Sequence, residues 1–395
     1  MDAKISYFNP KVDYSKEYLT FTALEDGMTV SFNKKASSGT LNYSIDEGNT
    51  WNVLESNVAT PSVNAGEKIM FKGSLIPQSS SGIGVYSTTK KFDVSGNAMS
   101  LLYADDFVGQ IYLTSKSYAF YYLFSGCTRV INAKDLILPA TYLGGYCYRY
   151  MFYGCTSLTS APKLPATHLE GCCYEGMFRN CTSLTSAPEL PATTLKSNCY
   201  DSMFRRCTSL TSVPSILPAT TLARNCYTNM FNSCTSLTSA PELPATTLAQ
   251  ACYDEMFSGC TSLTSAPELP ATTLAEYCYD GMFNGCTSLT SAPELPVTTL
   301  ANYCYQYMFE GCISLTSAPE LPATKLASCC YRGMFSGCTS LNYIKMLATN
   351  ISASSCLNNW VSNISSTGTF VKNKNATWNT TGTSGIPSGW TVETV

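Results

Sequence analysis

The sequence has few charged residues and a single histidine, and each shortage excludes a class of function. Lys, Arg, Asp and Glu together make up 13% of the 395 residues, and the net charge is -3. Nucleic-acid recognition needs clustered Lys and Arg, so we expect no nucleic-acid partner. One histidine, His168, is not enough for a Ser-His-Asp set, and no Gly-rich phosphate loop follows a clear strand. We therefore predict that the protein is not an enzyme and needs no cofactor.

Long apolar segments are missing as well. Hydrophobic residues make up 45% of the chain, but no run reaches about 18 apolar residues, so no membrane span is expected. Residues 1–7 show no apolar core followed by a small-residue cleavage site, so we expect no signal peptide in this chain. Either the protein is made in the cytosol before release or a leader was removed, and these two histories stay open.

Cysteine, by contrast, is abundant, and its spacing is periodic. Most of the 20 cysteines fall into two columns. The first column is Cys127, Cys155, Cys181, Cys207, Cys234, Cys260, Cys286, Cys312 and Cys338, and the second is Cys147, Cys173, Cys199, Cys226, Cys252, Cys278, Cys304, Cys330 and Cys356. Neighbours in a column are 26 positions apart almost everywhere, and only Cys172 and Cys329 lie outside. This period predicts a solenoid of about ten 26-residue repeats over residues 101–360.

The repeating unit reads G-C-T-S-L-T-S-A-P-E-L-P-A-T-T-L-A-x-x-C-Y-x-x-M-F-x, and residues 260–283 show it nearly unaltered. The first copy has Leu123 and Phe124 in place of Met-Phe, and the last has Trp360 and Val361. Degenerate end copies are expected of a solenoid, because its terminal repeats face water on one side.

The second half of the unit predicts a helix. Four apolar residues of one unit are spaced by four, namely Leu274, Cys278, Met282 and Cys286. This spacing gives one apolar stripe of a helix, with Thr272 or Thr273 as its N-cap and a left-handed Gly285 at its end. Three units replace this glycine, with Asn180, Arg206 and Ser233. Arg206 fits a left-handed position worst, so we expect that corner to differ locally.

The first half of the unit cannot be helical throughout, because Pro293 and Pro296 interrupt it. Residues 288–292 form a short strand candidate that would stack on its equivalents in neighbouring units. A helix of about 12 residues is marginal alone, so the units must bury their apolar stripes against one another. Helix and strand together predict an α+β, leucine-rich-type solenoid.

The cysteines are predicted to be buried, reduced thiols. Zinc sites want closely spaced ligand pairs, whereas the gaps here are 8 and 18, so no metal is expected. Cysteines eight apart on a helix lie about 12 Å apart, and packed helices lie about 8–10 Å apart. A disulfide needs Cα atoms within about 7 Å. Both pairings are therefore disfavoured, although a pairing of cysteines 18 residues apart stays open.

The string M-F-x-G-C-T-S-L-T-S, as at residues 256–265, resembles the leucine-rich repeats of bacterial surface-antigen proteins of the BspA or Treponema type, and especially their Met-Phe-rich relatives. The resemblance covers about residues 118–360, and the chain departs from it by inserting Cys-Tyr-x-x before Met-Phe. It implies a curved solenoid used for adhesion or protein recognition. The Pro-Glu-Leu-Pro-Ala-Thr-Thr-Leu variety is similar to products of gut bacteria and their phages, which implies a cell-surface or virion location, such as a phage tail.

Both flanks lack the repeat. In residues 1–100, the segments 18–22, 28–32 and 68–71 alternate as strands do, which predicts a β-sandwich-like domain. This domain would attach the protein to a larger virion or surface assembly. Residues 361–395 are rich in Ser, Thr, Asn and Gly and contain Trp378 and Trp390, so we expect a C-terminal β cap.

Residues 44–51 look like an Asp-box, a hairpin known from sialidases and other β proteins. We expect a structural role in which Asp46 caps the turn, Gly48 permits it and Trp51 packs beneath. A glycan-active enzyme is a distant third interpretation of the chain, and it would require an acidic pair lining a cleft.

The glutamates of Pro-Glu-Leu-Pro would form one acidic stripe. They are Glu189, Glu242, Glu268, Glu294 and Glu320. A calcium site is one interpretation, but we favour a solvated edge, because each side chain can extend into water.

The units differ mainly around Cys-Tyr-x-x-Met-Phe, and these variable positions are rich in Tyr and Arg, which anchor recognition surfaces. The candidate binding residues are Tyr146, Arg149, Tyr150, Tyr153, Arg179, Arg205, Arg206, Arg224, Tyr277, Tyr303, Tyr307 and Arg332. We predict an adhesin or receptor-binding protein that recognises an external host-surface protein or glycan through these helix-side positions. The alternative is a structural spacer in a virion or cell-surface assembly, in which exposed positions simply drift.

Overall fold

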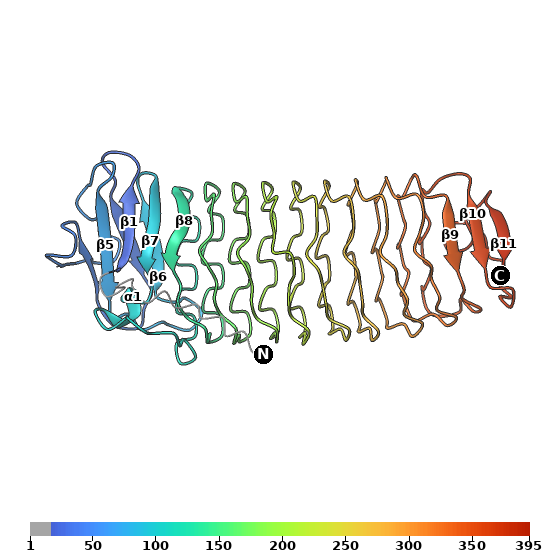
Figure 1. Ribbon diagram of the computed structural model, residues 1–395, viewed down its shortest axis with the longest axis horizontal. Coiled ribbons are helices and arrows are strands. Elements are labelled where there is room, and N and C mark those ends of the chain that lie inside the picture. Colours follow the sequence, from blue (N-terminus) through green and yellow to red (C-terminus); the bar gives the residue numbers. More distant parts are fainter. Residues whose placement is uncertain (1–16) are drawn as a thin grey trace, which may run out of the picture.

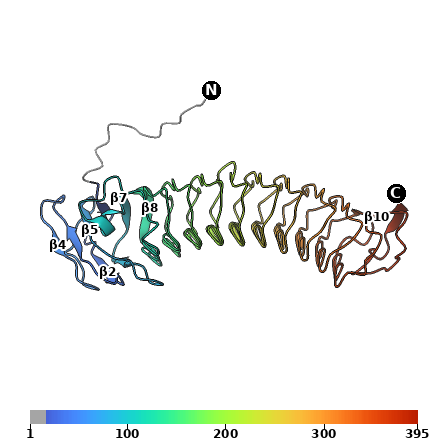
Figure 2. The same ribbon diagram turned by 90° about the horizontal axis from the view of Figure 1, so that it is seen from below.

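The computed structural model describes residues 17–395. Residues 1–7, on which the signal-peptide expectation rests, lie outside this range. Figure 1 shows an elongated molecule in which a β-rich end, a row of stacked units and a C-terminal cap follow one another. In the second view the row bends gently (Figure 2). The curved solenoid implied by the family resemblance is therefore present.

Seven strands precede the array, and they form most of two sheets. They are β1 (Leu19–Ala23), β2 (Val30–Lys34), β3 (Leu41–Ser44), β4 (Asn52–Val53), β5 (Lys68–Gly73), β6 (Gly84–Thr88) and β7 (Phe92–Asn97), followed by the short helix α1 (Ser100–Tyr103) and by β8 (Val130–Ile137). One sheet has the order β4-β3-β5-β1-β7-β8, and β2 pairs with β6 in the other. The predicted strands near 18–22, 28–32 and 68–71 are confirmed as β1, β2 and β5, each shifted by at most two residues.

The two sheets face each other across an aromatic core, as in a sandwich. The ring of Tyr86 on β6 lies 4.9 Å from that of Phe21 on β1 and 5.0 Å from that of Phe71 on β5. Phe124, in the first unit of the array, lies 5.8 Å from both Phe21 and Tyr86. Strand β8, which belongs to the array, pairs in parallel with β7. Sheet and core thus continue through the boundary that the sequence placed at residue 100.

The helix predicted for each unit is wrong. Residues 277–286, here called the turn segment, form overlapping turns, and α1 is the one helix in residues 17–395. The N–H groups of residues 278, 280, 282, 284 and 286 donate to the carbonyl three residues back. Those of residues 277, 279, 281, 283 and 285 donate to the next unit, for example from Phe283 to Met308 at 2.9 Å. An α-helix would use these groups internally, so the α+β class and the N-cap roles of Thr272 and Thr273 are wrong as well.

Every fourth residue of a turn segment is left-handed. The φ angle is +57° at Tyr277, +56° at Gly281 and +71° at Gly285, and equivalent residues share this sign in ten segments from residue 118 to 363. Gly285 is therefore left-handed as predicted, although it ends no helix. The corner at Arg206 is not different, because its φ is +62°. Its N–H donates to Asn232 of the next unit at 2.8 Å, and this bond holds the same backbone that glycine adopts elsewhere.

Residues 288–297, here called the proline segment, form the other side of the unit. The strand expected at 288–292 is reduced to isolated bridges such as Ser265 with Ser291. Pro293 has no N–H to donate to a ladder. Threonine hydroxyls replace part of the lost bonding, since Thr290 Oγ1 donates to the Thr264 carbonyl at 3.3 Å.

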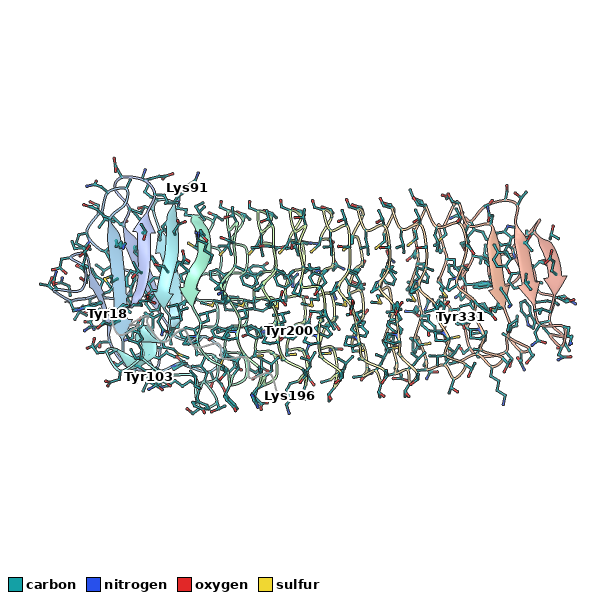
Figure 3. All side chains as sticks on the ribbon, viewed as in Figure 1. Tyr18, Lys91, Tyr103, Lys196, Tyr200 and Tyr331 are labelled. Atoms are coloured by element: carbon teal, nitrogen blue, oxygen red, sulfur yellow. The ribbon has the colours of Figure 1, made fainter. Side chains whose placement is uncertain are left out.

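Side chains of the turn segments fill the core in columns. The rings of Tyr279 and Tyr305, one unit apart, stack with centroids 5.8 Å apart. Met282 is fully buried, as its place on the apolar stripe predicted. Figure 3 shows Tyr200 and Tyr331, two further members of the tyrosine column, within the stack.

All 20 cysteines are unpaired thiols, and 19 of them are buried. The unit spacing of 8–10 Å that argued against disulfides is wrong, because the rings of Phe178 and Phe204 lie only 5.5 Å apart. The thiols instead donate hydrogen bonds to the preceding unit: Cys286 Sγ lies 3.2 Å from the Phe257 carbonyl, and equivalent bonds recur from Cys155 to Cys338. The first-column cysteines from Cys155 to Cys338 thus act as small buried donors, and the pairing over 18 residues is not formed.

The C-terminal residues continue the stack with three short strands. Strands β9 (Tyr343–Met346), β10 (Thr369–Lys372) and β11 (Thr391–Thr394) pair in parallel. Trp378 and Trp390 fix the cap, because their indole N–H groups donate to backbone carbonyls at 2.9 Å.

Candidate functional site

The candidate binding residues lie on or beside the turn segments, and most of them form two patches. The first patch is Tyr146, Arg149, Tyr150, Tyr153, Arg179, Arg205 and Arg206, and the second patch is Tyr277, Tyr303, Tyr307 and Arg332. Arg224 is exposed and belongs to neither patch. The positions expected on helices are thus turn positions that project from successive units.

Several of these residues occupy left-handed positions against ordinary backbone preference. They are Tyr146, Tyr150, Arg206, Tyr277, Tyr303 and Tyr307. A side chain there costs roughly 1–2 kcal/mol relative to glycine. Gly176 and Gly281 hold equivalent positions in other units, so the fold does not require tyrosine. Stacking of two rings, as between Tyr277 and Tyr303 at 4.4 Å, stabilises the fold by about 0.5–1.5 kcal/mol, which offsets much of this cost. The rings therefore contribute little net stability.

Arg149 is the centre of the first patch. Its guanidinium carbon lies 4.8 Å from the ring centroid of Tyr150 and 5.5 Å from that of Tyr146. Arg149 Nη2 lies 2.6 Å from Glu175 Oε1, and the Tyr150 hydroxyl donates to the same oxygen at 2.9 Å. Burial, and next the Glu175 carboxylate, raise the pKa of Tyr150. These contacts neutralise Arg149 and hold both rings in fixed orientations.

Two glycines make room for patch tyrosines. A Cβ atom on Gly176 would lie 2.1 Å from Cε1 of Tyr150, and one on Gly333 would lie 2.3 Å from Cδ1 of Tyr307. Each tyrosine ring therefore lies against a bare backbone one unit ahead. The two patches share this arrangement.

Arg179 and Arg205 form a different environment within the first patch. They follow Phe178 and Phe204 directly, and so stand at the same place in neighbouring units. Arg179 lies 6.0 Å from the ring centroid of Tyr153. The ion pairs of residues 17–395 include Arg149 but neither of these arginines. Burial, and next the neighbouring Arg179, lower the pKa of Arg205, although a guanidinium stays charged at physiological pH.

Acidic side chains separate the two patches. Burial and repulsion from Asp280 raise the pKa of Asp254 to about 8. Burial and repulsion from Glu255 raise the pKa of Asp280 to about 7. Arg332 of the second patch lies 5.8 Å from the ring of Tyr307, and its charge lowers the pKa of Asp280. Buried carboxyl groups thus lie on the turn side between the arginines of the first patch and Arg332.

Comparison with models of known protein families identifies the repeat. The chain matches the BspA type leucine rich repeat region in 6 copies, over residues 115–238, 174–315 and 250–379. The protein belongs to this BspA-type family. No curated protein and no solved structure matches the chain. BspA-type arrays are generally protein-binding, adhesion-type surface repeats.

Sequence reasoning missed aromatic residues at the start of the BspA-type array. Tyr118 stacks on Tyr146 at 4.6 Å. Tyr142 stacks between Tyr112 at 4.9 Å and His168 at 4.0 Å. Three of these rings precede the regular units, where the spacing is 28 rather than 26, so aligning the repeats did not reveal these stacks. His168 is exposed, in keeping with the predicted surface role.

The proline segments of the BspA-type array offer a different surface. The five glutamates of the predicted stripe are exposed, and Glu320 accepts from Lys345 at 3.0 Å. A shallow hollow of 420 Å³ lies between neighbouring proline segments and is lined by Pro293, Glu294 and Pro319 among others. No group of three or more His, Cys, Asp or Glu in residues 17–395 is arranged to hold a metal ion. Nor is any helix in this range long and apolar enough to cross a membrane.

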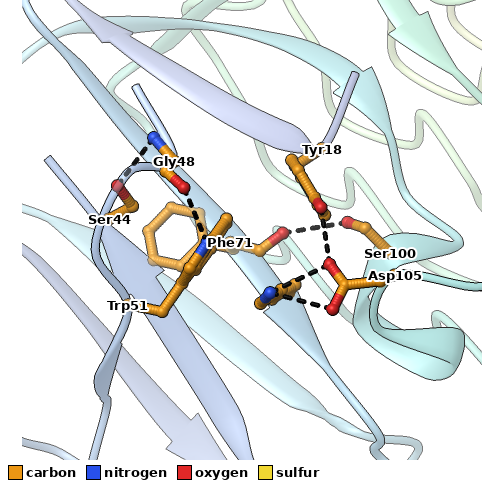
Figure 4. Close-up of polar contacts among 8 residues, drawn as sticks. Tyr18, Ser44, Gly48, Trp51, Phe71, Ser100 and Asp105 are labelled. Carbon is orange, nitrogen blue, oxygen red and sulfur yellow. Dashed lines mark hydrogen bonds and ion pairs between the residues drawn. The ribbon is translucent and has the colours of Figure 1, made fainter. Parts of the chain in front are cut away.

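The Asp-box hairpin is held by its own hydrogen bonds, as predicted, and Figure 4 shows those that Gly48 makes with Ser44 and Trp51. Asp46 Oδ1 accepts from the Ser44 hydroxyl at 2.7 Å and from the Thr50 N–H at 2.9 Å. These bonds, led by that from Ser44, lower the pKa of Asp46 to about 2. Trp51 Nε1 donates to the Gly48 carbonyl at 3.0 Å, and Gly48 has a φ of +86°. The carboxylate is thus occupied within its own hairpin.

Figure 4 also shows a group of polar contacts around Asp105, beside the hairpin. The hydroxyl of Tyr18 donates to Asp105 at 2.5 Å, and Lys72 Nζ lies 2.9 Å from the same carboxylate. Lys72 also lies 4.4 Å from the ring centroid of Trp51. These contacts tie β1 and β5 to the loop after α1.

Proposed function

We propose that the protein is an adhesin or receptor-binding protein that recognises an external protein or glycan through its first patch, and that it acts by binding rather than by catalysis. The observation that carries this proposal is the grouping of half-buried tyrosines and arginines from neighbouring units at positions that add little net stability. Tyr and Arg are the side chains most often found at binding hot spots. The N-terminal sandwich would attach the array to a virion or to a cell-surface assembly.

The first patch suits recognition because its rings are already ordered. Arg149, Glu175 and Gly176 fix Tyr150 before any partner arrives. A preordered ring loses little conformational entropy on binding. Tyr153 and Arg179 extend the patch into the next unit.

A rigid spacer is the second candidate, and the continuity of the core favours it. Strand β8 pairs with β7 of the sandwich, and β9 pairs with β10 of the cap. Buried side chains form one core from the sandwich to the cap. Such a rod would serve to hold its two ends apart.

Replacing Tyr150, Tyr153, Arg179 and Arg205 together by alanine tests the proposal. Each substitution at a surface position should change the free energy of unfolding by no more than about 0.5 kcal/mol, whereas loss of a binding anchor costs about 2 kcal/mol or more. The measurement is attachment of the whole protein to a panel of intact bacterial and epithelial cells, beside a thermal melt. The matched control is Glu242→Gln, Glu268→Gln and Glu294→Gln on the proline segments. Retained attachment with an unchanged melt would reject the first patch and favour the spacer.

A further inference from the structure

Arg179 and Arg205 form an unneutralised cation pair, which is unusual for half-buried charges. Nε of each arginine is shielded from solvent and has no hydrogen-bond partner, as is also true of Arg149, but these two arginines lack the ion pair that Arg149 makes with Glu175. Taking a charge out of water is costly unless a counter-charge or hydrogen bonds replace the lost hydration. The exposed Arg206 adds a third positive charge, and it too lowers the pKa of Arg205.

The acidic side chains near this pair are already engaged. Glu175 is bonded to Arg149 and Tyr150. Asp201 accepts from the hydroxyl of Ser202 at 2.7 Å and from Asn198 at 3.2 Å.

Glu255, the remaining carboxylate that acts on Arg205, lies two units further along the array. It accepts from Asn232 Nδ2 at 3.2 Å. No carboxylate among residues 17–395 forms an ion pair with either arginine, so both guanidinium groups are open to an anion from outside.

Resting on the proposed function, we propose that Arg179 and Arg205 bind the carboxylate or sulfate of an anionic saccharide, with Tyr153 as the platform for a neighbouring sugar ring. The residues before the arginines stack 5.5 Å apart. At this separation one oxyanion can accept hydrogen bonds from both guanidinium groups.

The pitch of the array favours a saccharide over a peptide. The same column of the array reads Tyr153, Arg179, Arg205 and Asn232. Successive units lie 5.5–5.7 Å apart at this point, measured between the phenylalanine rings beside the column. This spacing is close to the length of one pyranose unit. An extended peptide would instead repeat its side chains on one face about every 6.6–6.8 Å.

Binding of the whole protein to immobilised polymers tests the assignment. The probes are polygalacturonate and its methyl ester, dextran sulfate and dextran, and poly-glutamate. We expect retention on the carboxylated or the sulfated polysaccharide that weakens with salt, and little retention on the neutral polymers. Retention on one anionic polysaccharide alone identifies which oxyanion is bound. Equal retention on a charged polymer and its neutral counterpart, or stronger retention on poly-glutamate, would overturn the assignment.

Variants make the test specific to the two arginines. Arg179→Gln with Arg205→Gln should weaken retention about tenfold or more, whereas Arg179→Lys with Arg205→Lys should keep part of it, because charge remains without the guanidinium fork. The matched control, Arg129→Gln with Lys325→Gln, removes two exposed charges elsewhere and should bind normally. Unchanged retention by the glutamine pair would reject the site.

The two proposals can fail separately. Loss of cell attachment in the fourfold variant, with no retention on any anionic polysaccharide, would reject the saccharide site and keep the recognition function. Retention that depends on the arginine pair, together with cell attachment that the fourfold variant leaves unchanged, would keep the saccharide site and reject that function.

Discussion

Across the interface between the unit at residues 277–302 and the next, the turn segment contributes five backbone hydrogen bonds, from residues 277, 279, 281, 283 and 285. Proline segment 288–297 contributes fewer: in this described part of the chain no backbone hydrogen bond joins it to the next proline segment, and one, from the Thr290 N–H to the Thr264 carbonyl at 3.3 Å, joins it to the preceding one. A shallow hollow of 420 Å³ lies between this proline segment and the next. The Thr290 hydroxyl also donates to the Thr264 carbonyl of the preceding unit, at 3.3 Å.

This difference shows where the array is held together. A proline cannot donate, so the proline segment cannot complete a parallel ladder. The turn segment combines that ladder with stacked rings and buried thiols, whose contributions add at each interface. Perturbations of the turn segment should therefore be far more damaging than equivalent ones of the proline segment.

High pH should cause the largest loss of stability, because the buried thiols lie in the turn segments. Burial raises the pKa of Cys278 and of Cys286 from 9.0 to about 12. Thiols with a raised folded pKa stabilise the fold below the unfolded value, and this stability is lost as pH rises from about 9 to about 12. Each such thiol should cost about 1.4 kcal/mol per pH unit in this range. We expect the array to unfold in a steep transition as the pH rises. Circular dichroism measured against pH would detect it.

Thiol chemistry supplies the control for the alkaline transition. Alkylation at pH 8 should leave the column cysteines of the native protein unmodified, and the denatured protein should show 20 reactive thiols. Cys278→Ala should make the transition less steep. Quantitative disulfides, or an array that melts equally at pH 8 and pH 11, would contradict the buried-thiol account.

Met282→Asp should give the next largest effect. An unpaired charge in the core costs several kcal/mol, and each unit depends on its neighbours, so more than one unit should unfold. Hydrogen exchange would map the extent of unfolding. Met282→Leu, which keeps volume and polarity, and Thr290→Asp on the exposed proline segment should each stay within about 1.5 kcal/mol of the parent. Equal exchange in Met282→Asp and the parent would mean that Met282 is not a core residue in solution.

Ser233→Gly should stabilise the protein modestly. Ser233 has a φ of +62°, and removing its Cβ relieves a left-handed side chain, with an expected gain of about 0.5–1 kcal/mol. Ser258 lies in the turn segment of the following unit outside the left-handed positions, so Ser258→Gly should slightly destabilise. Chemical denaturation measures both variants, and a loss at Ser233 would show that its hydroxyl matters more than its backbone.

Thr290→Val should have the smallest effect. It removes one hydroxyl bond to the preceding unit, at 3.3 Å, from an exposed position. We expect a loss of about 0.5 kcal/mol. A loss of several kcal/mol would mean that the hydroxyl ladder carries as much of the interface as the turn segment, and would remove the contrast between the two sides.

The sequence correctly predicted which side chains of the turn segment are buried, but it did not predict the backbone hydrogen bonds of that segment. Cys278, Met282 and Cys286 are buried where the apolar stripe placed them. Their spacing of four fitted a helix, yet it is the repeat of a turn with one left-handed residue in four. Gly281 and Gly285, four apart in one unit, were a signal of that turn.

The candidate site was predictable in composition but not in pairing. Tyr and Arg at variable positions were visible in the sequence. That Arg149 is neutralised by Glu175, while Arg179 and Arg205 are not, depends on which side chains meet across an interface. Residues 26 apart become neighbours only after the units stack.

The sequence by itself determined the period, the buried columns, the strands of the sandwich and the β character of the cap, because hydrophobicity and backbone propensity act locally. Only the tertiary structure decided whether an N–H group of the turn segment bonds within its own unit or to the next. A helix satisfies these groups internally at once. The turns satisfy half of them only when a neighbouring unit presents its carbonyls in register, and no single unit contains that neighbour.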